Sequence, residues 1–421
     1  MKKQLLIIGM FAVFLTGCST ESDDTTMESE ARSAVSMSSE LSNVPIEFET
    51  FGLDGDASFT RGALESSNVS LDDLGIFCLA QRVTNQSAVN TIPKRSGASA
   101  ITWYLSGITE QYQAYKALNV WQNNVQGKIE STDGGASYQV KYANPWDNIY
   151  YPSNPAYSYG FAAYYPRTEW IRYRNASMID AFIKIDGNDD VIFAAAECPS
   201  SLPNQAYSAT YYENWTTAKK PYFKFKHMTS RLDFYLKLDA EVDPAKHYYL
   251  DSVVVQNFPH IMMLTMVRSS NKVVEAASTY CYVQNQSGCD TIPMLAGEKY
   301  TGNFYLRAAG DASLRDAHLQ LTTSYPSAPM GDGIMIPPVH KANSVSSLNV
   351  IVYLRDDEGN IYHNGVPFVI PAPTAGFEKS KRYKVSINLK PSTGHSVAFG
   401  AHELTEWDDP DSATELPEVG D

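Results

Sequence analysis

Short apolar runs, separated by turn-forming residues, recur along most of the chain. In FKFKH and RLDFYLKL, apolar and charged residues alternate, which is typical of a strand with one buried and one solvated face. The intervening residues are rich in Gly, Pro, Asn and Asp, which favour turns. Many short strands with few helices are typical of β-sandwiches, so the pattern predicts an all-β chain.

Two stretches predict hairpin turns and one predicts a helix. IDGNDD, which begins at Ile185, and RDDEGN, which begins at Arg355, each place Asp, Asn and Gly between apolar arms, a composition that favours a hairpin turn. In residues 107–122, by contrast, Tyr112 and Leu118 belong to a set of apolar residues at helical spacing, which predicts a helix.

The length of the chain accommodates two domains. We place the boundary near residue 258, where NFPHIMM introduces a Pro and interrupts the alternation. The predicted domains are therefore residues 44–258 and 259–421.

The start of the chain predicts a targeting signal. A basic beginning precedes an apolar run over residues 5–15, which is too short to span a bilayer and predicts a secretory signal peptide over residues 1–17. The following LTGC is similar to the lipobox of bacterial lipoproteins. By that similarity, Cys18 is the lipidated first residue of the mature chain and gives it a lipid anchor. The alternative is an ordinary secretory signal that ends by chance in a Cys.

The residues that follow the signal predict a tether. Residues 18–43 are acidic, rich in Ser and Thr, and nearly free of large apolar side chains, so they cannot bury enough surface to order themselves. The whole chain has a formal net charge of −14. Negative charge of this size disfavours binding to polyanions, so we expect no nucleic-acid partner.

The signatures of common catalytic sites are missing from the sequence. It contains no GxSxG, no HExxH and no phosphate-binding Gly loop. We therefore predict that the protein is not an enzyme and needs no cofactor; a hydrolase is the alternative, and no constellation of residues supports it.

No metal site is predicted either. The eight His are never spaced i, i+2 or i, i+4, so no local pair of His can coordinate a metal ion. His227 is interpreted as a hydrogen-bonded structural residue. Four residues match liganding positions of a calcium loop, but Val191 stands where that loop needs Gly, so a hairpin turn is favoured. The four are Asp186, Asn188, Asp190 and Glu197.

The cysteines after Cys18 have different surroundings. Cys78 lies in an apolar run and is interpreted as a buried small hydrophobe. An exported chain permits disulfides, and Cys281 and Cys289 are close enough in sequence to form a bridge at the end of a hairpin. The sequence leaves the pairing of the thiols open.

Aromatic residues are dense between positions 138 and 173. Among them, Trp146, Tyr150, Tyr151 and Tyr157 form a candidate adhesive surface, since exposed Trp and Tyr offer flat apolar faces with a polar tip. The alternative is a core strand with a Tyr-rich loop packed on it, because aromatics are ordinary core residues of β proteins. The loop PWDNIYYPSNPAYS is too polar and too rich in Pro to be core throughout, so we expect part of it to be exposed.

Arg61 lies in DGDASFTRGA, a polar stretch with Gly at positions 55 and 62, of the kind that proteases reach. It follows a predicted strand, VPIEFETFGL at residues 44–53, in which Ile46 and Phe48 alternate with acidic residues, as suits half-buried pairing. Loss of that strand would leave backbone groups unpaired and apolar side chains exposed, which favours addition of a strand from another chain.

The chain resembles the fimbrillin family, the lipoprotein-derived pilins called type V or Mfa-like. The resemblance covers most of residues 44–410 and rests on the order of several stretches. These are FETFGLDGDASFTRG, LDDLGIFCLA, FAAYYP, DDVIFAAA, FKFKHMTSRLDFYL, GFEKSKRYKVSINL and LTEWDD.

The resemblance implies two transthyretin-like β-sandwich domains in series, in a lipoprotein on the outer face of the outer membrane. It also implies that an Arg-specific protease cuts after Arg61, removes the propeptide part over residues 44–61 and leaves Gly62 as the new N-terminus. A strand of another pilus subunit then fills the vacated groove, and a ligand on a host or bacterial surface is implied for adhesion.

Residues 408–421 suit the donor role poorly, because DDPDSATELPEVGD holds two Pro and six acidic residues where a donor strand needs alternating apolar side chains. We therefore expect a tip or minor subunit of a pilus, which contributes to adhesion in the fimbrium. The alternative function is a surface glycan-binding lipoprotein that does not polymerise. Trypsin separates the two, since only the pilin is expected to be cut first after Arg61.

Overall fold

The computed structural model describes residues 41–51, 71–83, 101–103, 120–131, 137–144, 150–152, 157–175, 178–188, 190–196, 207–214, 218, 220–223, 225–267, 275–280, 300–308, 312–340, 347–364, 366–392 and 396–407. These residues form strands and two short helices, α3 (Ala209–Asn214) and α4 (Leu314–Ala317). The prediction of an all-β chain is confirmed. Neither described helix has the length and apolar character that crossing a membrane requires.

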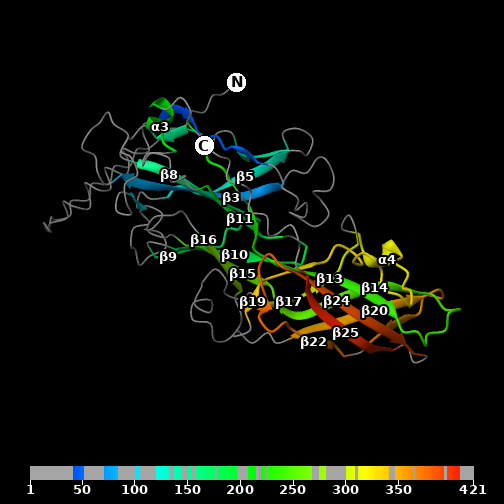
Figure 1. Ribbon diagram of the computed structural model, residues 1–421. Helices are drawn as coiled ribbons and strands as arrows, with labels where there is room; N and C mark the ends of the chain where they lie inside the picture. The colour runs from blue at the N-terminus through cyan, green and yellow to red at the C-terminus, as the bar shows by residue number, and fades with distance from the viewer. Residues whose placement is uncertain are drawn as a thin grey trace, which may run out of the picture.

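The first sheet has eight strands and forms the centre of the upper lobe in Figure 1. Its strands run, from edge to edge, β12 (Lys226–His227), β11 (Ile192–Ala196), β8 (Tyr157–Tyr165), β3 (Leu71–Val83), β5 (Val120–Ser131), β6 (Tyr138–Tyr142) and β2 (Thr50–Phe51), with β4 (Ile101–Trp103) paired to β3. Residues 120–122, the end of the predicted helix, are strand in β5, so that part of the prediction is wrong; its other residues lie outside the described ones.

Both faces of the first sheet are buried. Successive residues of a strand point to opposite faces, and in β8 Phe161 and Ala163 pack in one apolar cluster while Ala162 and Tyr164 pack in another. We call the first cluster the upper core. It lies beneath β1 (Leu41–Pro45), β7 (Tyr150–Pro152) and α3, which Figure 1 shows above the sheet. Burial on both faces explains why the strand reads as a nearly continuous apolar run.

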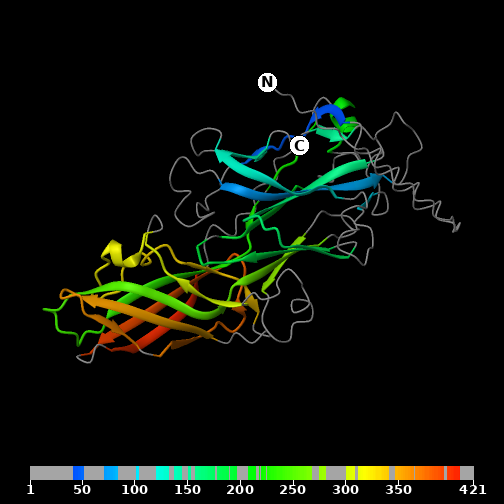
Figure 2. The same ribbon diagram turned by 180° about the vertical axis from the view of Figure 1, so that it is seen from behind.

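The second sheet covers the opposite face of the first, and both ribbon views show it beneath the first sheet (Figures 1 and 2). Its strand order is β16 (Glu275–Tyr280), β15 (Ile261–Val267), β10 (Met178–Lys184) and β9 (Ile171–Asn175). Alternate residues of its strands, including Ile179, Ala181 and Leu264, join Phe77 and Tyr164 of the first sheet in the second cluster, which we call the main core.

The third and fourth sheets form the lower lobe and share the main core. The third contains β18 (Ile334–Ile336), β13 (Ser230–Leu238), β24 (Arg382–Pro391) and β25 (Val397–Trp407). The fourth contains β17 (Thr301–Tyr305), β14 (Tyr248–Pro259), β20 (Ser347–Asp356), β21 (Ile361–His363) and β22 (Phe368–Pro371). A two-stranded pair, β19 (Val339–His340) and β23 (Gly376–Phe377), completes the described strands. Among the described ladders, the pairing of β13 with β24 is parallel.

The chain does not divide at residue 258. β13, which precedes that residue, and β14, which runs through it, pair with β24 and β20 of the lower lobe. β15, which follows it, pairs with β10 in the second sheet. The predicted boundary therefore cuts through paired strands, because a break in sequence alternation marks the end of a strand and does not show which lobe the next strand joins.

Only one of the two predicted hairpin turns is a hairpin. RDDEGN connects β20 to β21, which pair antiparallel, and Gly359 in the turn has a positive φ of 86°, which favours glycine. IDGNDD instead connects β10 of the second sheet to β11 of the first, so that hairpin prediction is wrong.

Candidate functional site

Residues 41–51, which we call the N-terminal segment, lie across the upper core. β1 pairs with β7, with Pro45 opposite Tyr150, and β2 forms the edge of the first sheet beside β6, with Thr50 opposite Gln139. Residues 46–49 belong to no strand. The predicted single strand over residues 44–53 is thus two short strands with an extended link between them, so far as the structure describes it.

The side chains of this link alternate between the core and solvent. Ile46 and Phe48 are 4% and 2% exposed, whereas Glu47 and Glu49 are exposed. Among the residues that the structure describes, all other buried members of the upper core lie at residue 71 or later. Two side chains of the N-terminal segment therefore close a core that the rest of the chain supplies.

Phe48 fills an aromatic pocket. Its ring centroid lies 4.9 Å from that of Phe223, 5.3 Å from that of Phe161 and 5.7 Å from that of Tyr142. The contact with Phe161 is edge-to-face, a favourable arrangement for aromatic pairs. Burial of a Phe side chain is worth about 1.5–3 kcal/mol of hydrophobic free energy, so this pocket is a principal anchor of the segment.

Polar contacts outside the strand pairing also hold the segment, including a hydrogen bond of 2.7 Å from the Ser42 hydroxyl to the Tyr151 carbonyl. Gln139 donates a side-chain hydrogen bond of 2.9 Å to the Phe48 carbonyl, and the Glu49 amide donates one of 2.9 Å to the Pro221 carbonyl. Glu47 forms an ion pair of 2.7 Å with Lys220. Because both charged side chains are about half exposed, this pair contributes little to stability.

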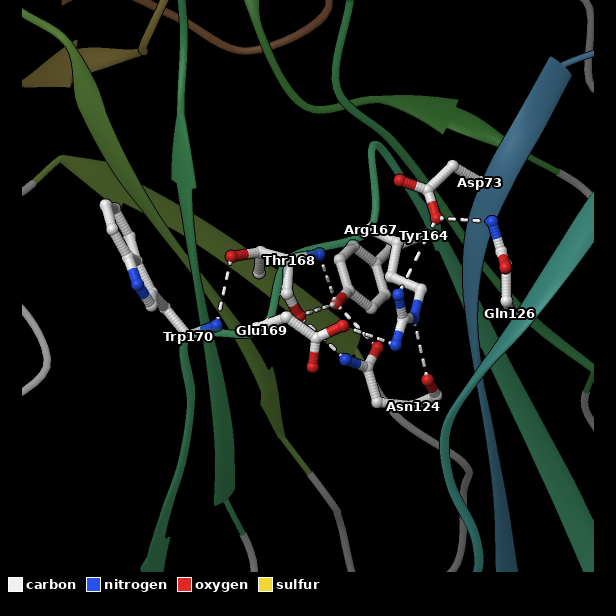
Figure 3. Close-up of polar contacts among 8 residues, drawn as sticks. All are labelled: Asp73, Asn124, Gln126, Tyr164, Arg167, Thr168, Glu169 and Trp170. Atoms are coloured by element: carbon white, nitrogen blue, oxygen red, sulfur yellow. Dashed lines mark hydrogen bonds and ion pairs between the residues drawn. The ribbon is translucent and has the colours of Figure 1, made fainter.

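Beyond the N-terminal segment, the described chain resumes at β3, whose start is held by the polar network in Figure 3. The Arg167 amide donates to the Asp73 carbonyl at 2.8 Å, and the Arg167 guanidinium lies 3.7 Å from the Asp73 carboxylate. The same guanidinium donates to the Asn124 carbonyl at 2.9 Å and pairs with Glu169 at 2.5 Å. The network thus ties the first residues of β3 to β5 and to the loop after β8.

Tyr164 is the buried centre of this network. Its hydroxyl donates to the Asn124 side-chain oxygen at 2.8 Å and accepts from the Thr168 amide at 3.2 Å, while Asn124 donates to the Thr168 carbonyl at 2.7 Å. Burial raises the pKa of Tyr164 well above its ordinary value, so the hydroxyl keeps its proton and remains a donor. A Cβ on Gly75 would lie 2.3 Å from the Tyr164 ring, so the close approach requires glycine.

Most of the predicted site residues lie outside the described ones. This applies to the lipidation site Cys18, the processing site Arg61 and Gly62, the aromatic Trp146, and the candidate disulfide of Cys281 and Cys289. They stay predictions.

The remaining residues of the candidate adhesive surface differ in their exposure to solvent. Tyr150 is 37% exposed. Tyr157 begins β8, opposite Arg82. Tyr151 is fully buried in the upper core and stacks on Tyr212 at 5.4 Å, so its assignment to a surface is wrong. In a strand, successive side chains point to opposite sides, which separates Tyr150 from Tyr151.

Of the candidate calcium-loop residues, Glu197 lies outside the described ones, and the others make protein contacts. The carboxylate of Asp190 contacts the imidazole of His227 and the hydroxyl of Thr229, and the Asp186 carboxylate accepts from the Asn188 amide at 2.7 Å. The interpretation of His227 as a hydrogen-bonded structural residue is confirmed. Among the described residues, no group of His, Cys, Asp or Glu is arranged to hold a metal ion.

Cys78 is fully buried in the upper core as a free thiol, which confirms its interpretation as a small hydrophobe. Burial raises the pKa of its thiol well above the ordinary value. The reactive thiolate is therefore scarce while the upper core is closed.

Sequence reasoning missed the partners of Phe48 and the role of Tyr164. Phe223 lies far from Phe48 along the chain and reads only as part of an alternating strand. FAAYYP reads as a core strand, and nothing local marks its first Tyr as the centre of a polar network. The Gly at position 75, in the middle of an apolar strand, is the one local signal of a close approach.

No protein-family profile matches the sequence, and no curated protein matches it. Solved structures do. A protein from Bacteroides uniformis provisionally described as a cell adhesion protein is 16% identical, with 86% of this chain and 97% of that chain covered and a TM-score of 0.39. A fimbrial protein from Bacteroides vulgatus is 11% identical, with 86% and 99% covered and a TM-score of 0.39. The tip fimbrial protein Mfa3 from Porphyromonas gingivalis, with a C-terminal truncation, is 12% identical, with 81% and 100% covered and a TM-score of 0.28. The chain is thus similar to solved proteins described as fimbrial or cell adhesion proteins, the class that its sequence resembles.

Proposed function

We propose that the chain is a subunit of a surface pilus and that its N-terminal segment is a removable cover of the upper core. The observation that supports this most is the burial of Ile46 and Phe48. These two side chains close a core whose other buried members all lie at residue 71 or later. A cut behind the segment leaves it held only by non-covalent contacts, namely two short strand pairings, the burial of Ile46 and Phe48, and surface polar contacts.

The cut falls after Arg61, between the N-terminal segment and β3. Release of the segment empties the pocket of Phe48 and leaves the outer edge of β6 without its partner β2. An unpaired edge beside exposed apolar side chains favours the addition of a strand from another chain. The contacts of Asp73 with Arg167 keep the start of β3 in place after the cut.

The finer parts of the proposal concern place and role. Lipidation of Cys18 holds the precursor at the outer membrane, facing outwards, and processing transfers the body to the fimbrium. The acidic, Pro-containing residues 408–421 are a poor donor strand, which favours a tip or minor position. Adhesion to a host or bacterial surface then belongs to this subunit, with the exposed Tyr150 as the candidate contact.

Limited digestion with an Arg-specific protease tests the proposal. We expect the first cut after Arg61, a stable body that begins at Gly62, and association of that body with strand donors. Arg61→Ala should block both cutting and association, whereas the matched variant Arg32→Ala, in the acidic tether, should change neither. N-terminal sequencing and size-exclusion chromatography measure the two results. Residues 44–61 still present in the assembled form on native cells would rule the mechanism out.

The alternative, a glycan-binding lipoprotein that does not polymerise, makes the opposite prediction. Nicking would then be scattered and would not lead to assembly, and the uncut protein would bind carbohydrate. A glycan array probed with the Arg61→Ala variant distinguishes this alternative from the pilus subunit.

A further inference from the structure

The N-terminal segment is held at its centre by side chains and at its ends by strand pairing. β1 pairs with β7 and β2 pairs with β6, but residues 46–49 between them belong to no strand. When a strand is added to a sheet, backbone hydrogen bonds normally supply the affinity, and these bonds do not depend on sequence. Across the middle of this segment, the Glu49 amide and the Phe48 carbonyl are hydrogen-bonded, but no strand ladder forms there, and the buried side chains of Ile46 and Phe48 add contacts that depend on sequence.

The pocket of Phe48 is specific in size and chemistry. Rings of Phe223, Phe161 and Tyr142 surround the Phe48 ring at centroid distances of 4.9–5.7 Å. A smaller side chain at this position would leave a cavity, and surroundings relax only partly around a cavity. Two positions earlier, Ile46 is 4% exposed and requires an aliphatic residue. The residue between them, Glu47, faces solvent beside Lys220.

We propose that the vacated groove selects its partner by side chain, and that the incoming chain must present an aliphatic residue, a polar residue and an aromatic residue in succession. The aromatic residue takes the place of Phe48. This inference rests on the proposed function, since the groove is open only once the N-terminal segment has left. Residues 408–421 contain no aromatic residue, so that stretch of a second copy does not meet the requirement, and the partner strand comes from a different source.

The test uses the chain cut after Arg61 and freed of residues 1–61, and a fluorescent peptide of residues 41–53, LSNVPIEFETFGL, whose binding is followed by anisotropy. Three variant peptides compete with it: Phe48→Ala, Glu47→Gln, and the exchange of positions 47 and 48 (Glu47→Phe with Phe48→Glu). The exchange keeps the composition and moves the ring to the solvent side.

We expect the parent peptide to bind. The Phe48→Ala and exchanged peptides should bind roughly a hundredfold more weakly or worse, the size that loss of a buried Phe implies. Glu47→Gln should change the affinity by less than about fivefold, because the ion pair that it removes is exposed. A peptide of residues 408–421 should not bind.

The outcomes separate this inference from the proposed function. If the parent peptide does not enter the cut protein, the proposed function fails, and the inference fails with it. The parent peptide could instead bind while the Phe48→Ala and exchanged peptides bind within about threefold of it. The groove would then recognise the backbone of its partner and not the side chains, and only the side-chain requirement would be overturned. Equal binding of the 408–421 peptide would overturn it as well.

Discussion

At the scale of single residues, the N-terminal segment depends on Phe48 more than on its charged neighbours. The Phe48 ring is almost completely buried among three aromatic rings, whereas Glu47 and its partner Lys220 are about half exposed. Apolar burial therefore outweighs the ion pair, since an exposed pair contributes less than about 1 kcal/mol and truncation of a buried Phe costs several times more.

Replacing Phe48 with Ala should lower the free energy of unfolding of the uncut protein by about 3–5 kcal/mol. The variant loses the packing of the Phe48 ring against Phe223, Phe161 and Tyr142. Urea denaturation followed by intrinsic fluorescence measures the change. The control Glu47→Gln should change the free energy by less than about 1 kcal/mol, and equal effects of the two variants would contradict this ranking.

Cys78 should report the opening of the upper core. In the uncut protein it is fully buried, and burial raises the pKa of its thiol, so a maleimide should modify it slowly. After a cut at Arg61 and removal of the N-terminal segment, modification should be at least about tenfold faster, because thiol reactivity follows access and the thiolate fraction. Peptide mapping by mass spectrometry identifies the modified residue. The same rate before and after removal would show that the segment does not cover this thiol.

At the scale of elements, the start of β3 has polar contacts that do not involve the N-terminal segment. They are with Arg167 in the loop after β8 and with Gln126 in β5, and they add to the burial of Leu71 and Leu74 of the same strand in the upper core. The strand that follows the proposed cut therefore has its own anchor, and loss of the segment need not release it.

Replacing Tyr164 with Phe should lower the free energy of unfolding by about 1–3 kcal/mol, the usual cost of leaving buried groups without a hydrogen-bond partner. The groups affected are the Asn124 side-chain oxygen and the Thr168 amide. The matched variant Tyr150→Phe removes the hydroxyl of a Tyr that is 37% exposed and should be within about 0.5 kcal/mol of the parent. Thermal denaturation of both variants measures the difference.

The sequence predicts the local features of these elements well and their pairing poorly. The alternation of Ile46 and Phe48 with acidic residues correctly indicates which side chains are buried, because it depends only on the two-residue period of an extended chain. IDGNDD and RDDEGN have nearly the same composition, yet only RDDEGN joins paired strands. The difference arises from the distant strands that β10 and β11 join, β15 and β8 respectively, and no local pattern encodes that choice.

At the scale of the whole molecule, one apolar cluster connects the lobes. The main core includes Phe77 and Tyr164 of the first sheet, Leu264 of the second, and Val385 and Val352 of the third and fourth. A continuous core of this kind couples the stability of the parts that share it, since opening one part exposes the apolar surface of the next.

Calorimetry of the uncut protein should therefore show one main unfolding transition for both lobes, with a calorimetric enthalpy close to the van't Hoff value. Removal of the N-terminal segment exposes the upper core and should lower the transition temperature without splitting the transition. Two well-separated transitions in the uncut protein would show that the lobes unfold independently.

The order in which consecutive strands join the different sheets has a consequence for the ancestry of this protein. The chain passes from the first sheet to the third after β12, returns to the second sheet at β15, and reaches the fourth sheet again at β17. Among the described strands, no contiguous stretch of sequence contains the whole of one lobe and nothing of the other. Neither lobe could have been gained, lost or exchanged as a cassette by recombination at a single boundary. Relatives that differ in one lobe should therefore differ by point substitution and by loop insertion, with the path of the chain between the lobes retained.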